Sequence, residues 1–571
     1  MDRRIFVGIL GNMSGGKEDD GSGGELFVFG MWVDGIVRKC SCFLGNDSVI
    51  LNIPQKFFAM YFRKNGQRRQ KAMALRIQIS PDRIFGKRSP MLYGQFIEHF
   101  HRQIYDGIYD PKNPLSDEDG FRTDIIEAMK RIRVPVLRWP GGCFVSSYHW
   151  KDGVGKERKP FFDKAWRVED PNTFGTDEYI RLCRKIGCEP YICTNAGTGT
   201  AEEMSDWVEY CNLETEGQYA KWRIANGHPE PYQVHYWSIG NENYGHWEIG
   251  AKSAQEWGRL VRESAKMIKH VSPEAELSAA ALSDLDWNIS LLKNCAPWLD
   301  WISIHEYWDM MPEENRPAGY EECMAFTDHI DHAVDEVRGM LAAMKLTGQI
   351  RIAFDEWNLR SWHHPNVHTI KQGVGKESYL TPRDKNDDNS TYTMADAVFS
   401  ACFLNAMNRN CDIVGMANFA PVLNTRGCIY SDPEGIVLRS TYHVFDLYVN
   451  ELGDTVVDLW EKDSVPEMTV PHKQGGTRTV KTLDLLATRR SDREGIAIAA
   501  VNKHPSEAQE VTFETGKAGK AMIFRLNGDS KDAYNDVGRT RVKVVKEEPG
   551  AVGESFTVRL DPHSVNVIQI L

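Results

Sequence analysis

Strand-like apolar runs alternate with amphipathic stretches from Ala74 to about residue 440. Eight of the runs have the length and composition of buried parallel strands. They cover residues 92–99, 134–142, 189–196, 234–242, 275–281, 301–307, 350–356 and 412–421. The intervening stretches, such as 176–186 and 254–271, repeat apolar residues at helical spacing. Eight such units in about 350 residues predict an α/β fold, a (β/α)₈ TIM barrel, over residues 91–440.

The pattern changes near Thr441. Short alternating strands follow, for example 495–501, 510–513 and 556–560, separated by polar turns. This pattern predicts a C-terminal antiparallel β-sandwich of jelly-roll-like form over residues 441–571. At the other end, Leu75, Ile77 and Ile79 alternate with polar residues as in a half-buried strand. The barrel count has no place for it, so we expect residues 73–90 to join the sandwich.

Residues 1–72 do not match the rest of the chain. They mix Gly-rich, acidic and basic stretches with isolated apolar pieces and have no steady period. We interpret them as a disordered or spurious N-terminal extension with Met73 as the natural start; the alternative is a small extra module. Residues 11–17 nearly match a phosphate-binding loop, but Glu18 stands where Ser or Thr should follow, and that interpretation is set aside.

Composition narrows the class of protein. The chain has 571 residues and a formal net charge of −12, which argues against nucleic acid as a partner. Its apolar runs are shorter than the roughly 18 residues of a membrane-spanning helix. Twelve cysteines in so long a chain do not suggest a disulfide framework, and no zinc-type CxxC pair occurs. These features favour a reduced, cytoplasmic protein that binds neither nucleic acid nor membrane.

Two predicted strands end in a glutamate. Glu242 closes the fourth strand, within Gly240-Asn241-Glu242-Asn243, and Glu356 closes the seventh, within Phe354-Asp355-Glu356-Trp357-Asn358. In an α/β barrel the C-terminal strand ends converge on one face, where active sites are built. A single glutamate there could cap a helix or pair with an arginine. Two from different strands are the equipment of glycoside hydrolysis, in which one is the acid/base and the other the nucleophile or second base.

These motifs resemble a known family. Asn-Glu on strand four and Glu on strand seven resemble the clan of retaining (β/α)₈ glycosidases. Further motifs resemble glycoside hydrolase family 51, the α-L-arabinofuranosidases, over roughly residues 74–571. These are Tyr93-Gly94-Gln95-Phe96-Ile97-Glu98-His99, Leu137-Arg138-Trp139-Pro140-Gly141-Gly142-Cys143-Phe144 and Ser303-Ile304-His305-Glu306-Tyr307. The resemblance implies no metal and no cofactor, and an oligomer, often a hexamer.

The resemblance also implies roles for single residues. Glu242 would be the general acid/base, with a pKa raised by ionised Glu356, the nucleophile. The substrate-binding set would be Glu98, Arg138, Cys143, Asn241, His305, Tyr307 and Asn424. Within it, Glu98 would grip hydroxyls of the terminal furanose and Asn241 its 2-hydroxyl. Arg138 and His305 would hold the nucleophile, and Tyr307 would contact its outer oxygen.

The sequence also departs from the family pattern. Many relatives carry Asn at Cys143 and Gln at Pro421, two positions that line the sugar pocket, and we expect Asn424 to substitute. Arg360 stands where relatives often have an aromatic residue, so aglycone preference is not transferred. Residues 361–390 form a long loop after strand seven, which we expect to wall the catalytic face. His99 and His101 are spaced as in some metal sites, but no third ligand stands out.

We therefore predict a retaining, exo-acting α-L-arabinofuranosidase that hydrolyses terminal arabinose from arabinan or arabinoxylan oligosaccharides. The alternatives are an endo-β-1,4-glucanase or β-xylosidase of the same clan, or a non-catalytic carbohydrate-binding protein. Linkage and aglycone preference are not readable from the sequence.

Overall fold

A computed structural model describes residues 74–571 except 312–316, 363–386, 474 and 493, together with the backbone of four strands nearer the N-terminus. The chain divides into two compact units, Met1–Met73 and Ala74–Leu571. In the first unit, strands β1 (Arg4–Ile9), β2 (Leu26–Val33), β3 (Ile36–Leu44) and β4 (Asp47–Val49) pair antiparallel in that order. The predicted phosphate-loop match at 11–17 and most of the loop 361–390 lie outside the described residues.

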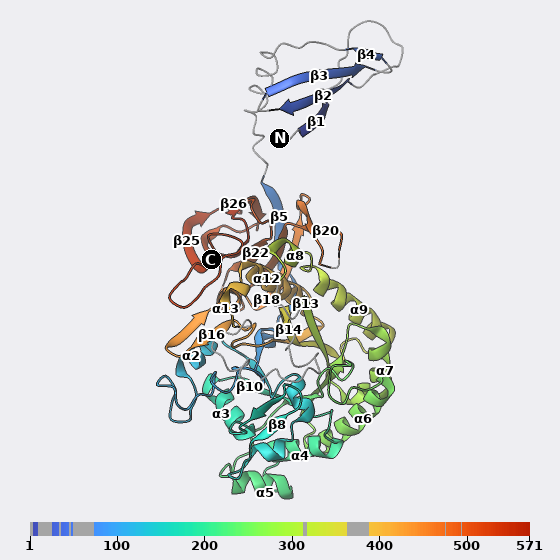
Figure 1. Ribbon diagram of the computed structural model, residues 1–571, viewed down its shortest axis with the longest axis vertical. Helices are drawn as coiled ribbons and strands as arrows, with labels where there is room; N and C mark the ends of the chain where they lie inside the picture. The colour runs from blue at the N-terminus through green and yellow to red at the C-terminus, as the bar shows by residue number, and fades with distance from the viewer. Residues whose placement is uncertain are drawn as a thin grey trace. The chain divides into compact units, whose positions relative to one another are not determined.

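Eight parallel strands of the second unit close into a barrel (Figure 1). They are β6 (Gly94–Phe96), β7 (Val136–Trp139), β10 (Glu189–Thr194), β11 (Tyr236–Ile239), β12 (Glu276–Ala281), β13 (Trp301–Met311), β14 (Arg351–Trp362) and β15 (Val414–Phe419). Each lies in or overlaps one of the eight predicted runs, and the predicted TIM barrel is confirmed. Two strands are longer than predicted, because β13 and β14 stay paired in parallel beyond the barrel wall.

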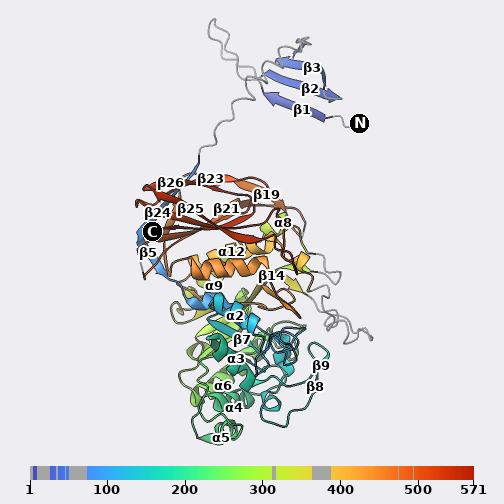
Figure 2. The ribbon, with the colours of Figure 1, turned by 90° about the vertical axis from the view of Figure 1, so that its left-hand side faces the viewer.

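A helix follows each barrel strand. These are α2 (Thr123–Arg131), α3 (Thr176–Ile186), α4 (Ala201–Asn212), α6 (Ala254–Val271), α7 (Leu285–Cys295), α9 (His329–Ala343), α12 (Met394–Arg409) and α13 (Ser440–Asn450). Helix α6 shows why the chain starts a helix here: the Ser253 hydroxyl accepts from the Glu256 amide, and the Glu256 carboxylate accepts from the Ser253 amide. Helix α12 is buried nearly all round because it lies between the barrel and the C-terminal strands (Figure 2).

The C-terminal part is a strand-rich domain built on one nine-stranded sheet. Its order is β25 (Lys543–Val552), β24 (Gly519–Asn527), β27 (Ser564–Ile570), β22 (Ile496–Asn502), β21 (Leu483–Arg489), β18 (Thr455–Glu461), β5 (Leu75–Lys87), β23 (Gln509–Glu514) and β26 (Ser555–Leu560). Strand β5 pairs antiparallel with β18 and parallel with β23. Ile77, Ile79 and Phe513 are buried with other apolar side chains in this part's own core.

The change of pattern comes later than the sequence indicated. Thr441 lies inside α13, the helix that follows the eighth barrel strand, and the C-terminal strands begin at Thr455. Helix α13 is rich in aromatic and β-branched residues, which favour strands locally; tertiary packing of Tyr442, Phe445 and Tyr448 in the core overrides that preference.

The structure also contains shorter helices, 3₁₀ turns and hairpins. They are the helices α5 (Gly217–Ala225) and α8 (Tyr320–Met324), the 3₁₀ turns η1 (Pro90–Tyr93), η2 (Cys143–Ser147), η3 (Trp150–Gly153), η4 (Ala296–Trp298) and η5 (Asn389–Thr391), and the hairpins β8–β9 (Phe161–Asp163, Val168–Asp170), β16–β17 (Ile429–Asp432, Gly435–Leu438) and β19–β20 (Glu467–Pro471, Thr477–Lys481). Among the described helices, none has both the length and the apolar character needed to cross a membrane.

Candidate active site

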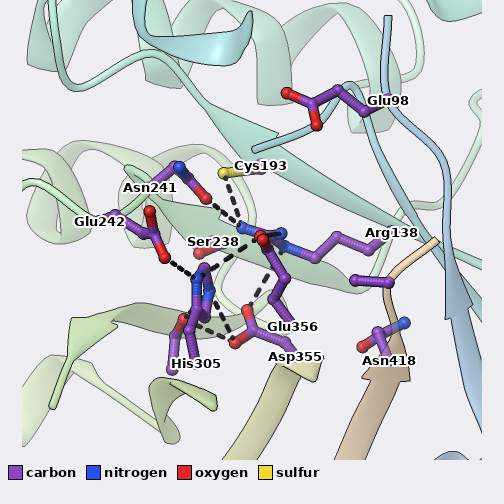
Figure 3. Close-up of polar contacts among 12 residues, drawn as sticks. Glu98, Arg138, Cys193, Ser238, Asn241, Glu242, His305, Asp355, Glu356 and Asn418 are labelled. Atoms are coloured by element: carbon purple, nitrogen blue, oxygen red, sulfur yellow. Dashed lines mark hydrogen bonds and ion pairs between the residues drawn. The ribbon is translucent and has the colours of Figure 1, made fainter. Parts of the chain in front are cut away.

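The two glutamates meet at the C-terminal end of the barrel (Figure 3). Glu356 lies within β14, and strand register places it beside His305 of β13, just after an irregularity in that pairing. Glu242 lies three residues beyond the end of β11 and has a φ of +45°, in the left-handed region that side chains rarely adopt. One carboxylate oxygen of Glu242 lies within 4.8 Å of one of Glu356.

Glu356 accepts hydrogen bonds at both of its carboxyl oxygens. Its Oε2 accepts a hydrogen bond from Arg138 at 2.9 Å, and its Oε1 accepts one from the Tyr307 hydroxyl at 2.6 Å. Arg138 is fully buried and donates to Asn241 Oδ1 at 2.9 Å as well. The guanidinium therefore links the nucleophile candidate to the asparagine beside Glu242. The structure thus brings Arg138, Asn241 and Tyr307 together around Glu356.

Glu242 accepts bonds at both oxygens. His305 Nδ1 lies 3.0 Å from Oε1, and the Trp247 indole N–H donates to Oε2 at 2.8 Å. Burial raises the pKa of Glu242, but the hydrogen bond and charge of His305, followed by the bond from Trp247, outweigh burial and lower it. The predicted raised pKa of this residue is therefore wrong for the unliganded site, because a cation that the prediction gave to Glu356 alone also binds Glu242.

His305 is shared between the two glutamates. Its Nδ1 lies 3.5 Å from Glu356 Oε2, and its Nε2 lies 3.5 Å from Asp355 Oδ1. Burial would lower the pKa of this histidine, but the charge of Glu356 and the bonds to Asp355 and Glu242 raise it to about 10. His305 is therefore an imidazolium at neutral pH, a fixed positive charge between the carboxylates.

Asp355 supports the arrangement of His305 and the two glutamates. Sequence reasoning gave it no role, although it directly precedes Glu356. It is fully buried and accepts from the hydroxyls of Ser303 at 2.6 Å and Tyr191 at 2.7 Å. Despite its burial, the charge of Arg138 and the bond from His305 lower its pKa to about 2. Asp355 is thus a fixed negative charge that orients both cations.

Glu98 lies on a separate wall of the same face (Figure 3). Its Oε1 accepts from the Phe144 amide at 3.1 Å and from the Trp166 indole at 2.8 Å. A Cβ added at Gly141 would meet Glu98 Cγ at 2.4 Å, so the glycine lets the β7 loop pass directly over this carboxyl. Burial, and then the charge of Glu356, raise the pKa of Glu98 to about 8.

Asn424 does not take the predicted place. Its amide donates to the Arg102 carbonyl at 2.5 Å and its carbonyl accepts from the Ser431 amide at 2.8 Å, within a buried turn at φ +53°. The prediction is wrong because this side chain holds the turn instead of facing the carboxyl cluster. The loop sends Arg426 there in its place, and Arg426 donates to the Tyr307 hydroxyl at 3.0 Å. In the sequence, Arg426 is only a lone arginine in a loop, and nothing else there indicates that it belongs to the site.

Cys143 lies beside the acid/base. Its sulfur, one carboxylate oxygen of Glu242 and one of Glu248 lie within 4.8 Å of one another. Burial and the charges of Glu248 and Glu242 raise the pKa of the thiol, so Cys143 stays neutral. Glu248 did not emerge from the sequence, because it follows the motif at Glu242 by six residues in an irregular loop.

Ion pairs explain three other residues that the sequence singled out. Arg360 is buried between Asp309 at 2.8 Å and Asp396 at 2.9 Å, so it is structural and its charge is not offered to an aglycone. His99 lies 2.8 Å from Asp170 and His101 lies 2.8 Å from Asp387. The two histidines therefore bind separate carboxylates and do not form one metal site.

Comparison with known proteins agrees with this site. Residues 128–333 match the model of the alpha-L-arabinofuranosidase 1 domain, and residues 355–564 match that of the alpha-L-arabinofuranosidase C-terminal domain. Alpha-L-arabinofuranosidase C of Emericella nidulans is 33% identical over 84% of this chain and 94% of its own length. An intracellular exo-alpha-(1->5)-L-arabinofuranosidase of Acetivibrio thermocellus is 30% identical over 76% of this chain and 86% of its own.

A solved structure indicates the same family. The alpha-L-arabinofuranosidase from Thermotoga maritima, in its arabinose complex, superposes with a TM-score of 0.77 at 34% identity, and the match covers 87% of this chain and all of that one. Both family models, the relatives and this structure agree on one family. The chain belongs to the glycoside hydrolase family 51 α-L-arabinofuranosidases.

Proposed function

We propose that this protein is a retaining, exo-acting α-L-arabinofuranosidase that removes terminal non-reducing arabinofuranosyl residues from arabinan or arabinoxylan oligosaccharides. The observation that carries the mechanism is the closeness of Glu242 and Glu356. Oxygens within 4.8 Å fit the carboxyl spacing of about 5–5.5 Å in retaining enzymes. They leave no room for the attacking water of an inverting site, whose carboxyl groups stand about 6.5–9.5 Å apart.

In the first step, Glu356 attacks the anomeric carbon while Glu242 protonates the departing oxygen. Two donors, Arg138 and Tyr307, hold and orient the Glu356 carboxyl group. As the ester forms, Glu356 loses its charge. The electron pair of the broken glycosidic bond goes to the leaving oxygen together with the proton from Glu242.

Glu242 must take up a proton before it can donate one in this step. Glu242 is ionised before substrate binds, and the imidazolium proton lies on the other side of a 3.0 Å hydrogen bond. Trp247 is 41% exposed, so an entering aglycone can displace its bond to Glu242 Oε2. Losing that donor favours the protonated form of Glu242, and the freed oxygen faces the leaving group.

In the second step, Glu242 acts as a base. It takes a proton from water, which attacks the glycosyl ester and releases arabinose with the original anomeric configuration. Glu242 thereby regains the proton that it gave in the first step, and the restored charge of Glu356 again stabilises the His305 imidazolium. His305 therefore gains a positioning role for both glutamates, where the motif implied only one.

The remaining predicted side chains would bind the sugar. We assign the terminal furanose hydroxyls to Glu98 and the 2-hydroxyl to Asn241, with Cys143 beside them. Supporting this, Asn241 is fixed by Arg138 at 2.9 Å, and Glu98 carries its two donors on one oxygen, which leaves Oε2 for a ligand.

A kinetic panel tests the function. Aryl α-L-arabinofuranoside should be cleaved at least 100-fold faster than aryl β-D-xylopyranoside, because a pocket built for a furanose misplaces a pyranose anomeric carbon (about 100-fold per Å-scale misplacement). NMR of the first-formed product should show retention. Cleavage of only the xyloside or of soluble cellulose would instead indicate a β-xylosidase or endo-β-1,4-glucanase, and binding without turnover would indicate a carbohydrate-binding protein.

We further propose that the enzyme works in the cytoplasm on imported oligosaccharides, as a homo-oligomer, with a hexamer as the family expectation. The intracellular relative supports the location. Fractionation of native cells and light scattering of the purified protein test these points. Mass measurement of the native protein tests whether residues 1–72 are present.

A further inference from the structure

Glu248 is turned into the barrel mouth by the loop that follows β11. Its amide donates to the Gly245 carbonyl at 3.0 Å, and only 4% of the residue is exposed. Nearby, a Cβ at Gly250 would meet the Gly197 Cα at 2.5 Å, so this loop packs directly against the loop after β10. The fold therefore buries a carboxyl group that no structural ion pair among the described residues requires.

The first oxygen of Glu248 fixes an amide in the sugar site. Its Oε2 accepts from Asn241 Nδ2 at 3.4 Å, while Asn241 Oδ1 accepts from Arg138 at 2.9 Å. The asparagine is thereby oriented from both sides, with its carbonyl toward the cation and its amino group toward Glu248.

The second oxygen has no such partner. Glu248 Oε1 is buried, and no described residue donates to it with ordinary hydrogen-bond geometry, although the Ser146 hydroxyl and the Cys143 thiol act on the carboxyl as weaker donors. It belongs to the group formed with Cys143 and Glu242, all within 4.8 Å. A thiol is a weak donor, and a buried polar atom without a partner costs about 1–3 kcal/mol. An unsatisfied oxygen beside the acid/base is what a site keeps for a ligand hydroxyl.

Glu248 is neutral in the unliganded site. Burial, and then the charges of Glu242 and Glu356, raise its pKa to about 8, although Ser146 and Cys143 act in the opposite direction. The balance of charges in this cluster is consistent with a neutral Glu248. Five carboxyl groups (Glu98, Glu242, Glu248, Asp355, Glu356) accompany three cations (Arg138, His305, Arg426). With protons on Glu98 and Glu248, three negative charges balance three positive ones.

We propose that Glu248 is a sugar-binding residue that works as a neutral carboxylic acid: its Oε2 accepts from the Asn241 amide, and its Oε1–H donates to a hydroxyl of the terminal sugar. This inference rests on the proposed function and adds to it a residue that the family motifs did not indicate. Cys143, which lies beside Glu248, is a poor hydrogen-bonding group. Glu248 supplies the polar contact that the thiol lacks.

The protonation state of Glu248 makes the proposal testable. A carboxylic acid donates one hydrogen bond and accepts others, whereas a carboxylate only accepts. Above pH 8 the donor is lost and a second negative charge stands beside Glu242. The KM of the wild-type enzyme for an aryl α-L-arabinofuranoside should therefore rise several-fold between pH 7 and pH 9. Glutamine keeps the donor and acceptor but does not titrate.

The experiment compares the wild-type enzyme with three variants from pH 5 to pH 9.5. At pH 6, Glu248→Ala should raise KM roughly tenfold, the effect of about 1.4 kcal/mol of lost binding, with a smaller change in kcat. Glu248→Gln should restore KM at pH 6 to within about twofold of wild type and should show a smaller rise of KM up to pH 9, because Glu98, whose pKa is also about 8, still titrates. A matched control is Glu306→Gln, another buried glutamate with a raised pKa, whose carboxyl accepts from Ser283. It should keep the wild-type rise of KM.

Binding of L-arabinose, followed by tryptophan fluorescence, gives a second readout that does not need turnover. It should weaken in Glu248→Ala and recover in Glu248→Gln. Equal KM and equal sugar affinity in Glu248→Ala and wild type would overturn the proposal, as would a Glu248→Gln enzyme that behaves like the alanine variant. If the wild type cleaves a different aryl glycoside, the substrate assignment fails separately, and the same comparison is made with that substrate.

Discussion

The mouth of the barrel and the core of the C-terminal strands are both buried, but they bury opposite kinds of group. The first encloses Arg138, Asp355 and Glu356, which are charged and at most 6% exposed. The second encloses Ile77, Phe513 and other apolar side chains. Burying charge is expensive unless every charge is paired, whereas burying apolar surface stabilises the fold. The catalytic chemistry of this protein therefore depends on paired buried charges at the barrel mouth, and its stability depends on apolar burial in the C-terminal core.

The largest test of this comparison removes the nucleophile. Glu356→Ala should lower kcat on the order of 10⁴-fold or more, the scale found when a nucleophile is lost. Azide should restore turnover and give the β-glycosyl azide, because the small anion attacks from the vacated side. A product of unchanged configuration would reverse the assignment of the two glutamates. Circular dichroism checks that the fold is kept.

A smaller loss is expected at the other glutamate. Glu242→Ala should reduce kcat about 10²- to 10⁴-fold for an alkyl or sugar leaving group, the range of general acid catalysis. The first step should be nearly unaffected for a dinitrophenyl leaving group, which departs without a proton. Measuring kcat/KM along a series of phenols separates the cases, and equal losses for all leaving groups would argue against an acid role.

A substitution in the C-terminal core should lower stability and leave activity unchanged. Phe513 is fully buried between β5 and β26, so Phe513→Ala should cost about 3–5 kcal/mol of unfolding free energy through lost burial and a cavity. At 25 °C the folded enzyme should keep its kcat, since no reacting group lies there. Urea unfolding followed by activity per folded molecule checks both halves. A matching fall in kcat would mean that the two regions are coupled.

The same contrast explains what the sequence could predict. The barrel and the C-terminal strands follow from apolar periodicity, and Glu242 and Glu356 follow from strand ends, because strand position determines where such side chains converge. Loop residues have no periodic pattern of apolar and polar positions, so the sequence did not identify Glu248 and Arg426 as site residues. For the same reason Asn424 was predicted to lie in the sugar pocket, although its side chain holds a turn. The sign of the pKa shift of Glu242 depends on one 3.0 Å contact with His305, which no sequence pattern encodes.

The charged region should also make stability depend on pH. Relative to ordinary values of 6.5 and 4.5, the folded pKa values of His305, Glu98 and Glu248 are raised to about 10, 8 and 8. A raised pKa gives stability that is complete below the unfolded value and is lost as pH rises through the folded one. All three act alike, so the urea midpoint should fall between pH 5 and pH 9.

The control for this pH effect is the variant that removes one of the three groups. Glu248→Gln should show a shallower fall over the same interval, because glutamine does not titrate. Phe513→Ala should shift the whole curve downward without changing its slope. A midpoint that rises from pH 5 to pH 9 would contradict the protonation states assigned to the barrel mouth.

The smallest effect concerns the exposed edge of the charged region. Trp247 donates to Glu242 Oε2 at 2.8 Å and favours its ionised form. Trp247→Phe keeps an aromatic surface but removes this donor, so the pKa of Glu242 should rise and the alkaline limb of kcat should move to higher pH. We expect kcat at pH 6 to change less than about fivefold, since one hydrogen bond is worth about 1 kcal/mol. An unchanged pH profile would mean that the Trp247 bond is already broken in the complex with substrate, leaving His305 as the group that sets the protonation of Glu242.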